Sequence, residues 1–370
     1  MTTFLLAGGG TAGHVSPLLA IADRLREREP NSTVLVLGTA EGLEARLVPV
    51  RGYELLTIGR LPFPRRLNRE ALRFPAALRR AVLDTRAIIR DRGVDVVIGV
   101  GGYVAAPAYL AANAEKVPIV IHEANAKPGI ANRLGARFTK YVGVTFSNTP
   151  IRNATHVGMP LRTEIENLDR ATARAEAQAL FGLAADTPVL LVTGGSTGAR
   201  SINATVAAIV PQVVGAGWQI LHITGERSDL VDSDFAGYVM LRYCDRMELA
   251  LAVADLAVSR AGSAILSELT AVGVPAILIP YPVGNGEQRF NAADLVEAGG
   301  AVIVHDADFT PAWVASTLVP LLLDRATVAE MAARSATVGV LDGTDRMVGL
   351  IDGALAAGAA GHPPKIGSDD

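Results

Sequence analysis

Short, continuously apolar runs rich in β-branched residues recur along the chain, and longer stretches with helical periodicity separate them. Nine of these runs have the length of buried strands, and they cover residues 3–8, 33–38, 95–100, 119–123, 141–146, 188–194, 218–225, 255–260 and 276–280. Continuous apolar strands that alternate with helices are typical of a parallel sheet covered on both faces. The pattern therefore predicts an α/β protein with doubly wound sheets.

One short motif occurs twice, each time between a predicted strand and a predicted helix. It reads AGGGTAGH at residues 7–14 and TGGSTGAR at residues 193–200. The series of strands starts again with the second copy, and the sheet pattern lapses at 157–170, where proline and charged residues appear. Such a lapse is typical of a domain boundary. The repeat therefore predicts two doubly wound α/β domains in tandem, each of which begins with its own strand, glycine turn and helix.

The length of 370 residues agrees with about two domains of ~150 residues each. We expect a first domain at 1–160 and a second at 161–344. A last helix at 345–360 is expected to pack back on the first domain, and the short polar tail at 361–370 is expected to be disordered.

Composition narrows the class of protein. A formal net charge of −3 argues against a general nucleic-acid binder. A single cysteine, Cys244, excludes an internal disulfide and a cysteine-based zinc site, and it fits a reducing compartment. No export signal is apparent at the N-terminus, and the long uncharged stretches 96–114 and 201–224 are interrupted by glycine, proline or polar residues. We therefore expect no transmembrane helix.

A glycine-rich turn between a strand and a helix leaves backbone amides bare where the helix dipole favours an anion. The first turn also matches the dinucleotide pattern through Gly8, Gly10 and Gly13. That interpretation needs a carboxylate at the end of the second strand, which instead ends in Gly38-Thr39, with the nearest acid at Glu41. Phosphate binding is favoured, and an NAD-dependent oxidoreductase remains an alternative.

The residues that close the two turns differ in chemistry. His14 stands at a predicted helix start, where the dipole favours the neutral imidazole that can accept a proton. We expect His14 to be a catalytic base, with local capping or packing as the alternative. Arg200 closes the second turn, where a cation can stabilise a diphosphate; a surface salt bridge is its alternative.

Three further segments place polar residues just beyond predicted strands, where open α/β sheets bind ligands. The first is the turn at 99–108, and the second, at 121–133, carries His122, Glu123, Asn125 and Asn132. Glu123 and Asn125 are candidate catalytic residues. The alternative for His122 and Glu123 is a buried pair that braces the loop.

The third segment, at 259–295, opens a helix at Ser263 and presents Glu268 within its first two turns. A second loop leads into Glu287-Gln288 and Asn291. A carboxylate at this position can accept hydrogen bonds from both hydroxyls of a ribose, and a side-chain amide can form hydrogen bonds with a base or a sugar. The segment is therefore a candidate nucleotide site.

Together these segments resemble the MurG family, which transfers N-acetylglucosamine to lipid I and so forms lipid II in peptidoglycan synthesis. The matching pieces, in order along almost the whole chain, are GGGTAGHVSP, GGYVAAPAYLAA, IHEANAKPGIANR, VGMPLR, TGGSTGARSIN, SRAGSAILSELTAVGVPAILIPYP and EQRFNAADL. The resemblance implies two Rossmann-like domains that face a cleft, the GT-B fold. It also implies a metal-independent enzyme without a cofactor that inverts the anomeric configuration of its donor, UDP-N-acetylglucosamine.

The resemblance assigns roles residue by residue. His14 is the expected base. The residues implied to bind the substrates are Thr11, Ala12, Gly13, Asn125, Arg162, Ser196, Cys244, Ser263, Ala264, Ile265, Leu266, Ser267, Glu268 and Gln288. Among these, Arg162 and Ser196 are expected at the diphosphate, Glu268 at the ribose and Gln288 at the transferred sugar. Some relatives carry glutamine at the positions of Glu287 and Thr197, so the resemblance assigns no side-chain role to either residue.

Two Asp-x-Asp pairs, Asp232/Asp234 and Asp306/Asp308, could suggest a metal. Neither lies beside a glycine turn, and the second precedes a predicted helix and is interpreted as a capping segment, so no metal is expected.

The stretch at 60–80 carries seven arginines against one glutamate, with apolar residues interleaved. A basic amphipathic stretch of this kind favours contact with an anionic lipid surface, and an ordinary solvated face is the alternative. Its candidate membrane residues are Arg65, Arg66, Arg69 and Arg73. With the lipid acceptor that the resemblance implies, we expect peripheral attachment to the cytoplasmic face of the bacterial cell membrane.

The expected partners are UDP-N-acetylglucosamine, lipid I and anionic lipid, not nucleic acid, and cell-wall synthesis and division proteins are candidate protein partners. Two alternatives to the transferase share the nucleotide chemistry: a nonhydrolysing UDP-sugar epimerase and a catalytically idle nucleotide-sensing module.

Overall fold

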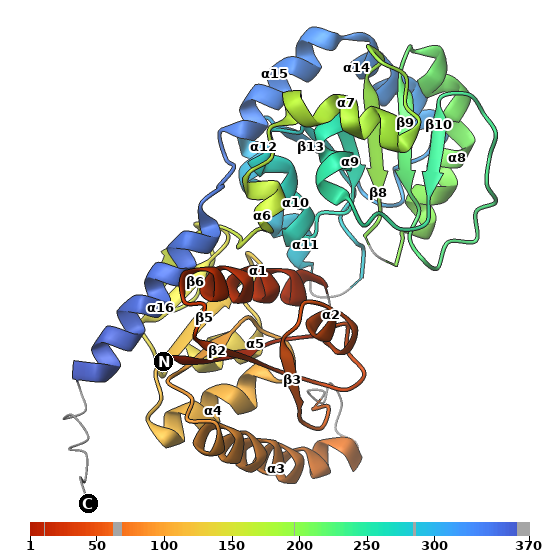
Figure 1. Cartoon of the computed structure of the whole chain (residues 1–370). Coiled ribbons are helices and arrows are strands. Elements are labelled where there is room, and N and C mark those ends of the chain that lie inside the picture. Colours follow the sequence, from red (N-terminus) through yellow and green to blue (C-terminus); the bar gives the residue numbers. More distant parts are fainter. Residues whose placement is uncertain (11, 62–68, 196, 284–285, 361–370) are drawn as a thin grey trace, which may run out of the picture. The chain divides into compact units, whose positions relative to one another are not determined.

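The computed structural model describes the chain except residues 11, 62–68, 196, 284–285 and 361–370, and of residues 12 and 69–71 it describes the backbone alone. The chain divides into two compact units (Figure 1). Unit 1 comprises Met1–Arg162 and the chain from Asp342 onward, and unit 2 comprises Thr163–Leu341. Each unit has its own parallel sheet and its own core.

Unit 1 contains a sheet in the order β3-β2-β1-β4-β5-β6-β7, and all of its pairings are parallel. Its strands are β1 Thr3–Ala7, β2 Thr33–Gly38, β3 Glu54–Thr57, β4 Val96–Gly99, β5 Ile119–Glu123, β6 Tyr141–Val144 and β7 Ala154–His156. Its helices are α1 Ala12–Arg28, α2 Glu44–Val50, α3 Arg69–Asp91, α4 Ala105–Glu115, α5 Ile130–Gly135 and α16 Gly343–Ala360.

Alternate residues of β1 enter two different cores. Phe4 and Leu6 belong to a cluster with α1 and α16, while Leu5 and Ala7 belong to a cluster with α3 and α4. Helices therefore cover both faces of the sheet, which explains why its strands are apolar throughout. The final helix α16 contacts α1, β5 and β6, so the end of the chain completes the core of unit 1.

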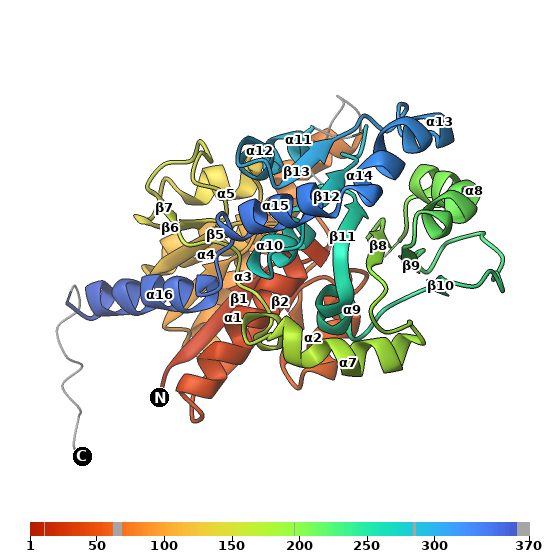
Figure 2. The same ribbon diagram turned by 90° about the horizontal axis from the view of Figure 1, so that it is seen from above.

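Unit 2 contains a parallel sheet in the order β10-β9-β8-β11-β12-β13. Its strands are β8 Val189–Thr193, β9 Gln219–Ile223, β10 Tyr238–Leu241, β11 Ala254–Ser259, β12 Ala276–Leu278 and β13 Ala301–Ile303. Its helices are α6 Thr163–Glu166, α7 Arg170–Phe181, α8 Arg200–Gly215, α9 Met247–Val253, α10 Ser263–Ala271, α11 Glu287–Asn291, α12 Ala293–Glu297, α13 Pro311–Trp313, α14 Val319–Leu323 and α15 Arg325–Ala336, with a π-helical turn at Val314–Leu318. Figure 2 shows the elements from above.

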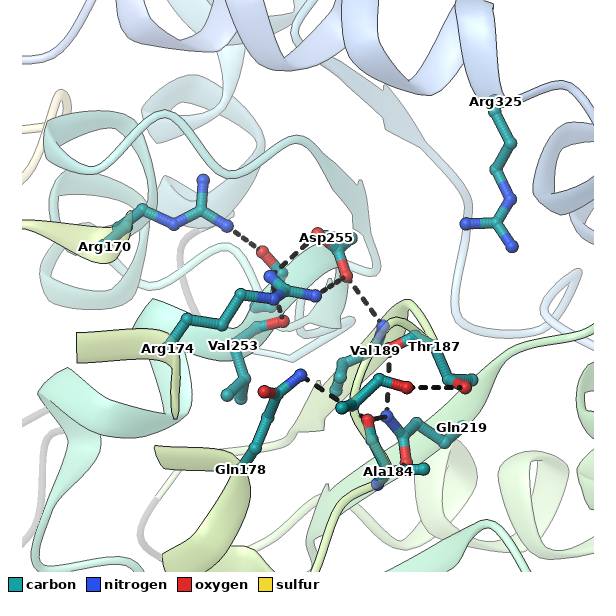
Figure 3. A network of polar contacts seen from close by, with 12 residues as sticks. Arg170, Arg174, Gln178, Ala184, Thr187, Val189, Gln219, Val253, Asp255 and Arg325 are labelled. Atoms are coloured by element: carbon teal, nitrogen blue, oxygen red, sulfur yellow. Dashed lines mark hydrogen bonds and ion pairs between the residues drawn. The ribbon is translucent and has the colours of Figure 1, made fainter. Parts of the chain in front are cut away.

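A polar network fastens α7 to the amino ends of the central strands of unit 2 (Figure 3). Arg174 forms two hydrogen bonds with the carboxylate of Asp255, at 3.1 and 2.8 Å, and that carboxylate also accepts the amide of Val189 at 2.8 Å. Val189 begins β8 and Asp255 lies at the start of β11. These contacts tie α7 to the amino edge of the sheet, opposite the carboxyl edge at which open α/β sheets bind ligands.

All nine predicted strands are present, and the predicted doubly wound α/β architecture is confirmed. Four strands escaped prediction: β3, β7, β10 and β13. They are short and lie at or next to the sheet edges, and β7 is exposed throughout. β3 and β7 contain polar residues, whereas β10 (YVML) and β13 (AVI) are apolar but only four and three residues long, which is shorter than the apolar runs used to predict strands.

Among the described helices, none alone has both the length and the apolar composition needed to cross a bilayer. One pair, Pro311–Leu323 with Arg325–Ala336, meets both criteria together but bends by 87° between its two parts.

Candidate active site

The first glycine-rich turn leads from β1 into α1 and packs against a second turn that follows β4. Gly10 has a φ of +91°, and Gly101 and Gly102 have φ of +97° and +84°, a conformation that favours glycine. A Cβ added to Gly102 would lie 2.7 Å from the carbonyl oxygen of Gly9. The two turns thus approach each other through backbone at the carboxyl edge of the sheet.

His14 lies in the first turn of α1, and its imidazole is held by the glycine turn. Nδ1 lies 3.2 Å from the carbonyl oxygen of Gly9. A carbonyl oxygen can only accept, so Nδ1 carries the proton and Nε2 is the basic nitrogen of this tautomer. A Cβ added to Gly101 would lie 3.0 Å from Nε2, so glycine there keeps side-chain atoms away from the basic nitrogen.

Burial lowers the pKa of His14 below its ordinary value of 6.5, opposed by the nearby charge of Glu123, by the hydrogen bond to Gly9 and by the charge of Glu44. The imidazole is therefore neutral near pH 7. The sequence predicted a neutral histidine through the helix dipole, whereas the structure adds burial as a cause of the same result.

Glu44, which the sequence analysis did not single out, is buried between the ends of β1 and β2. Its carboxylate accepts the amide of Gly10 at 2.7 Å, the amide of Thr39 at 3.0 Å and the hydroxyl of Thr39 at 2.8 Å. Burial alone would raise its pKa, but hydrogen bonds from Gly10, its own amide and Thr39 lower the pKa below the ordinary value. Glu44 is therefore ionised.

Three glycines make room for this carboxylate. A Cβ on Gly9, Gly42 or Gly38 would approach the side-chain atoms of Glu44 to 2.3, 2.1 and 2.6 Å. The Gly10 amide therefore already has an anionic partner from the protein itself, which changes the interpretation of the first turn as a phosphate loop. A sequence signal existed, since two of these glycines, Gly38 and Gly42, precede Glu44 within six residues, but it becomes recognisable only with the fold.

Glu123 ends β5 and braces the loop that follows it. Its carboxylate accepts the amide of Asn125 at 3.0 Å, the amide of Gly129 at 2.9 Å and the side-chain amide of Asn132 at 2.9 Å. Asn132 is held in turn by the hydroxyl of Tyr109 at 2.7 Å. The alternative role of loop brace thus describes Glu123, while Asn125 lies half-buried in the loop that Glu123 shapes.

His122 is fully buried on β5, with Nε2 at 3.1 Å from the carbonyl oxygen of Gly158. Burial, with a smaller effect of the neighbouring His14 in the same direction, lowers the pKa of His122 to about 4, although the hydrogen bond to Gly158 opposes this shift. Its Nδ1 has no hydrogen-bond partner among the described residues. This imidazole is neutral and belongs to the interior of unit 1.

The second glycine turn, in unit 2, follows β8 and packs against the end of β9. Gly195 and Gly198 have φ of +89° and +79°, and a Cβ on Gly198 would lie 2.2 Å from the carbonyl oxygen of Thr224. The side-chain amide of Asn203, in α8, donates to the same carbonyl at 2.8 Å, and its oxygen lies 3.1 Å from Nε2 of buried His222. This turn is therefore fixed from behind by a buried polar network.

The segment after β11 places the predicted nucleotide residues on α10. Ser263–Ala271 forms that helix, so Ser263, Ala264 and Ile265 stand at its amino end, while Leu266 is buried and Ser267 and Glu268 are half-buried. Gln288, at the start of α11, accepts the amides of Ala261 at 3.1 Å and Tyr281 at 2.8 Å through its side-chain oxygen. Its amide nitrogen makes no hydrogen bond to any residue in the described part of the chain, which leaves two donors for a ligand.

The interpretation of Asp306 as part of a helix cap is wrong. Asp306 accepts hydrogen bonds from Arg260 and, at 2.7 Å, from the hydroxyl of Ser201. The side chain of Thr310 caps α13 instead. Arg260 follows β11 directly, so Asp306 belongs to a partly buried ion pair at this edge of the sheet.

Arg200 and Arg162 have different surroundings from each other. The side chain of Arg200 is 92% exposed and lies 3.8 Å from Asp229, which supports the surface salt bridge that was its alternative. Arg162 is half-buried at the end of unit 1, and Cys244 is half-buried after β10.

Several predicted residues cannot be placed. Thr11, Ser196, Arg65 and Arg66 lie outside the described residues, and of Ala12 and Arg69 only the backbone is described. Arg73 is exposed on α3, next to Leu72, which is 83% exposed. Within the described residues, no three histidine, cysteine, aspartate or glutamate side chains gather as metal ligands.

Comparison with known families matches both units. Residues 4–144 match the glycosyltransferase family 28 N-terminal domain, and residues 189–347 match the glycosyltransferase family 28 C-terminal domain.

Full-length relatives share one description. The chain is 63% identical over 357 residues to the UDP-N-acetylglucosamine--N-acetylmuramyl-(pentapeptide) pyrophosphoryl-undecaprenol N-acetylglucosamine transferase of Leifsonia xyli subsp. xyli, covering 96% of this chain and 100% of that protein. It is 60% identical over 358 residues to the enzyme of the same name from Clavibacter sepedonicus, covering 96% of this chain and 98% of that protein.

Among solved structures, the crystal structure of Acinetobacter baumannii MurG has a TM-score of 0.75 and 27% identity, covering 95% of this chain and 100% of that one. The UDP complex of S. aureus MnaA has a TM-score of 0.69 at 12% identity, covering 99% of this chain and 100% of that one, a likeness that shows the fold alone.

Proposed function

Because the chain belongs to the MurG family of glycosyltransferases, we propose that it transfers N-acetylglucosamine from UDP-N-acetylglucosamine to undecaprenyl-pyrophosphate-linked lipid I and forms lipid II. The 4-hydroxyl of the N-acetylmuramyl sugar attacks the anomeric carbon, the bond to UDP breaks, and the configuration inverts. The observation that carries the proposal is the neutral His14, whose protonated Nδ1 faces Gly9 and leaves Nε2 as the basic nitrogen. A reaction of this kind needs that base at its acceptor hydroxyl.

His14 would take the proton of the attacking hydroxyl as the new bond forms. General base catalysis typically contributes about 10²–10⁴-fold to the rate. Because burial holds the imidazole neutral near pH 7, no prior deprotonation is needed. The loop that Glu123 braces would present Asn125 to the donor sugar, so Glu123 acts as a positioning residue.

Unit 2 would hold the donor. Glu268 is proposed to accept the ribose hydroxyls, and Gln288 to donate its side-chain amide to the transferred sugar, since its oxygen is already occupied by Ala261 and Tyr281. Backbone amides at the start of α10 and of the second glycine turn, together with Arg162, would stabilise the departing diphosphate. We propose that no cofactor or metal takes part.

The arginine-rich stretch at 60–80 is proposed to attach unit 1 to anionic lipid on the cytoplasmic face of the membrane, where the polyprenyl acceptor resides. Arg73 and Leu72, both exposed on α3, support this assignment from the described part of the stretch.

The test is a turnover assay with radiolabelled UDP-N-acetylglucosamine and a lipid I analogue. A β-linked disaccharide lipid with release of UDP is expected. Conversion of the sugar nucleotide without an acceptor would instead identify an epimerase, and binding of UDP without either product would identify a nucleotide-sensing module.

A further inference from the structure

A single peptide group connects His14 to a buried carboxylate. The carbonyl of Gly9 accepts the proton of His14 Nδ1 at 3.2 Å, and the N–H of Gly10, in the same peptide plane, donates to Glu44 Oε2 at 2.7 Å. The order of groups is therefore carboxylate, peptide, imidazole. Hydrogen bonds in such a chain polarise one another, because each donor becomes more acidic and each acceptor more basic.

We propose that Glu44 is the positioning residue of the catalytic base, and that it orients His14 and fixes its tautomer through the Gly9–Gly10 peptide. The role corresponds to that of the aspartate in a hydrolase triad, which holds its histidine by a direct contact. Here the peptide transmits the effect, so Glu44 touches neither His14 nor the substrates. The inference rests on the proposed role of His14 as base.

The geometry of Glu44 suits this task. Its carboxylate is 1% exposed and ionised, and its other oxygen is fixed by the amide and hydroxyl of Thr39. It therefore cannot rotate away from the Gly10 amide without losing two further hydrogen bonds. Gly9, Gly38 and Gly42 allow its close approach, and a side chain at any of them would displace it.

In the described part of the chain, two carboxylates from different elements shift the pKa of His14. Glu123 at the end of β5 and Glu44 at the start of α2 both raise the pKa of His14, while His122 on β5 is neutral. Removal of the Glu44 charge therefore lowers the pKa of His14 further, and the imidazole becomes a weaker base.

The first experiment uses the wild-type protein labelled with ¹⁵N at histidine, with His14 identified from the spectrum of His14→Ala. At pH 7.5 we expect Nδ1 of His14 to be protonated and Nε2 to be unprotonated. The opposite tautomer would overturn the proposal, whether or not any Glu44 variant folds.

The second experiment compares Glu44→Gln with wild type under the turnover assay. We expect kcat to fall about ten-fold, the lower end of the loss that follows when a metal-ligating histidine loses the hydrogen-bond partner that orients it. The KM for UDP-N-acetylglucosamine should be unchanged. In a plot of kcat against pH, the fall in kcat on the acid side should move to lower pH, because the pKa of His14 is lowered. Glu115→Gln removes a carboxylate paired with Arg86 and Arg90, remote from this chain of groups, and should change neither quantity.

The double variant separates the two hypotheses. In a His14→Ala background, Glu44→Gln should cause no further loss of kcat, because the imidazole that Glu44 positions is already absent. Full activity of His14→Ala alone would reject His14 as base, which is a failure of the proposed function. If His14→Ala is inactive but Glu44→Gln keeps the wild-type kcat and the wild-type pH dependence of kcat, the positioning role of Glu44 is rejected and the role of His14 as base stands.

Discussion

The side-chain oxygen of Gln288 accepts a hydrogen bond from the backbone amide of Tyr281 at 2.8 Å, and the same oxygen accepts the amide of Ala261 at 3.1 Å. One side chain thus ties the loop after β12 to the loop before α10. Because two backbone N–H groups donate to this oxygen, the orientation of the Gln288 side-chain amide is fixed. Its nitrogen is therefore the atom that can donate hydrogen bonds to a ligand.

Gln288→Glu should separate these two functions. The carboxylate keeps an oxygen for Tyr281 and Ala261 but replaces the donor nitrogen by an acceptor. We expect the KM for UDP-N-acetylglucosamine to rise about ten-fold, the scale of one hydrogen bond near 1.4 kcal/mol, with little change in the affinity for UDP. Gln288→Ala should in addition lower the midpoint of thermal unfolding, because it removes the acceptor for Tyr281 and Ala261. If Gln288→Glu lowers the affinity for UDP as much as that for UDP-N-acetylglucosamine, Gln288 contacts the nucleotide rather than the sugar.

Glu268→Ala should weaken UDP binding by about 1.5–3 kcal/mol, the scale of hydrogen bonds to a charged group. Titration calorimetry with UDP measures the effect directly, without an acceptor. Glu297→Ala, an exposed carboxylate on α12, is the matched control and should leave the affinity unchanged. An unaltered UDP affinity in Glu268→Ala would remove Glu268 from the nucleotide site.

Buried histidines should make the protein sensitive to mild acid. Burial lowers the pKa of His122 in unit 1 and of His222 in unit 2 to about 4, below the ordinary value near 6.5. Between pH 4 and pH 6.5 each of these histidines is protonated in the unfolded chain but neutral in the folded protein. The contribution of the neutral histidine to the free energy of unfolding is therefore fully present above pH 6.5 and is lost as the pH falls toward 4. Each histidine should account for about 3 kcal/mol over that interval.

Urea unfolding at pH 7.5 and pH 5 measures this loss. His222→Gln keeps a donor for Asn203 and an acceptor for Tyr238 but cannot titrate, so it should flatten the pH dependence of unit 2. His305→Gln, at an exposed position, makes the same chemical exchange outside the core and serves as the control. Parallel curves for wild type and His222→Gln would show that His222 does not carry the effect.

The sequence predicted the elements whose residues are buried on both faces, and with them the two parallel sheets. It also predicted the polar residues that follow β5 and β11, because the carboxyl ends of parallel strands meet at one edge. It missed Glu44, which lies 34 residues from its partner Gly10 in the sequence and is joined to it only by the pairing of β1 with β2. It misassigned Asp306 for the same reason, since the partner Arg260 is 46 residues away. Contacts made across a sheet edge leave no local periodicity.

Asp306→Ala should destabilise unit 2 by about 3 kcal/mol, because it leaves the guanidinium of Arg260 buried without its carboxylate. Arg260 is 9% exposed, and its other partners among the described residues are uncharged: the carbonyls of Ile279 and Pro280, the hydroxyl of Ser201 and the ring of Tyr281. Asp308→Ala removes the other member of the Asp-x-Asp pair, which is exposed, and serves as the control in thermal unfolding. Equal midpoints for the two variants would contradict a stabilising role for the ion pair.

Replacement of Arg65, Arg66, Arg69 and Arg73 by glutamine should weaken binding to vesicles that contain anionic lipid. Each arginine near such a surface contributes about 1 kcal/mol at low salt, so the four together should change the partition coefficient by well over ten-fold. The effect should shrink in 0.5 M salt, where charges on a surface are screened over a few ångströms. Turnover of a soluble lipid I analogue should be spared, because these side chains are assigned to the membrane and not to the reaction.

One control variant makes this result specific. Arg325, which stacks on Trp218 in unit 2, can be exchanged for glutamine together with Arg334, Arg346 and Arg28 to remove the same charge elsewhere. That variant should bind vesicles as wild type does, because attraction to a lipid surface depends on where the charges gather and not on net charge alone. If both sets weaken binding equally, the arginine-rich stretch has no special role and attachment follows from total charge. If neither set matters and binding ignores salt, apolar insertion must dominate, and the exposed Leu72 would be the next residue to replace.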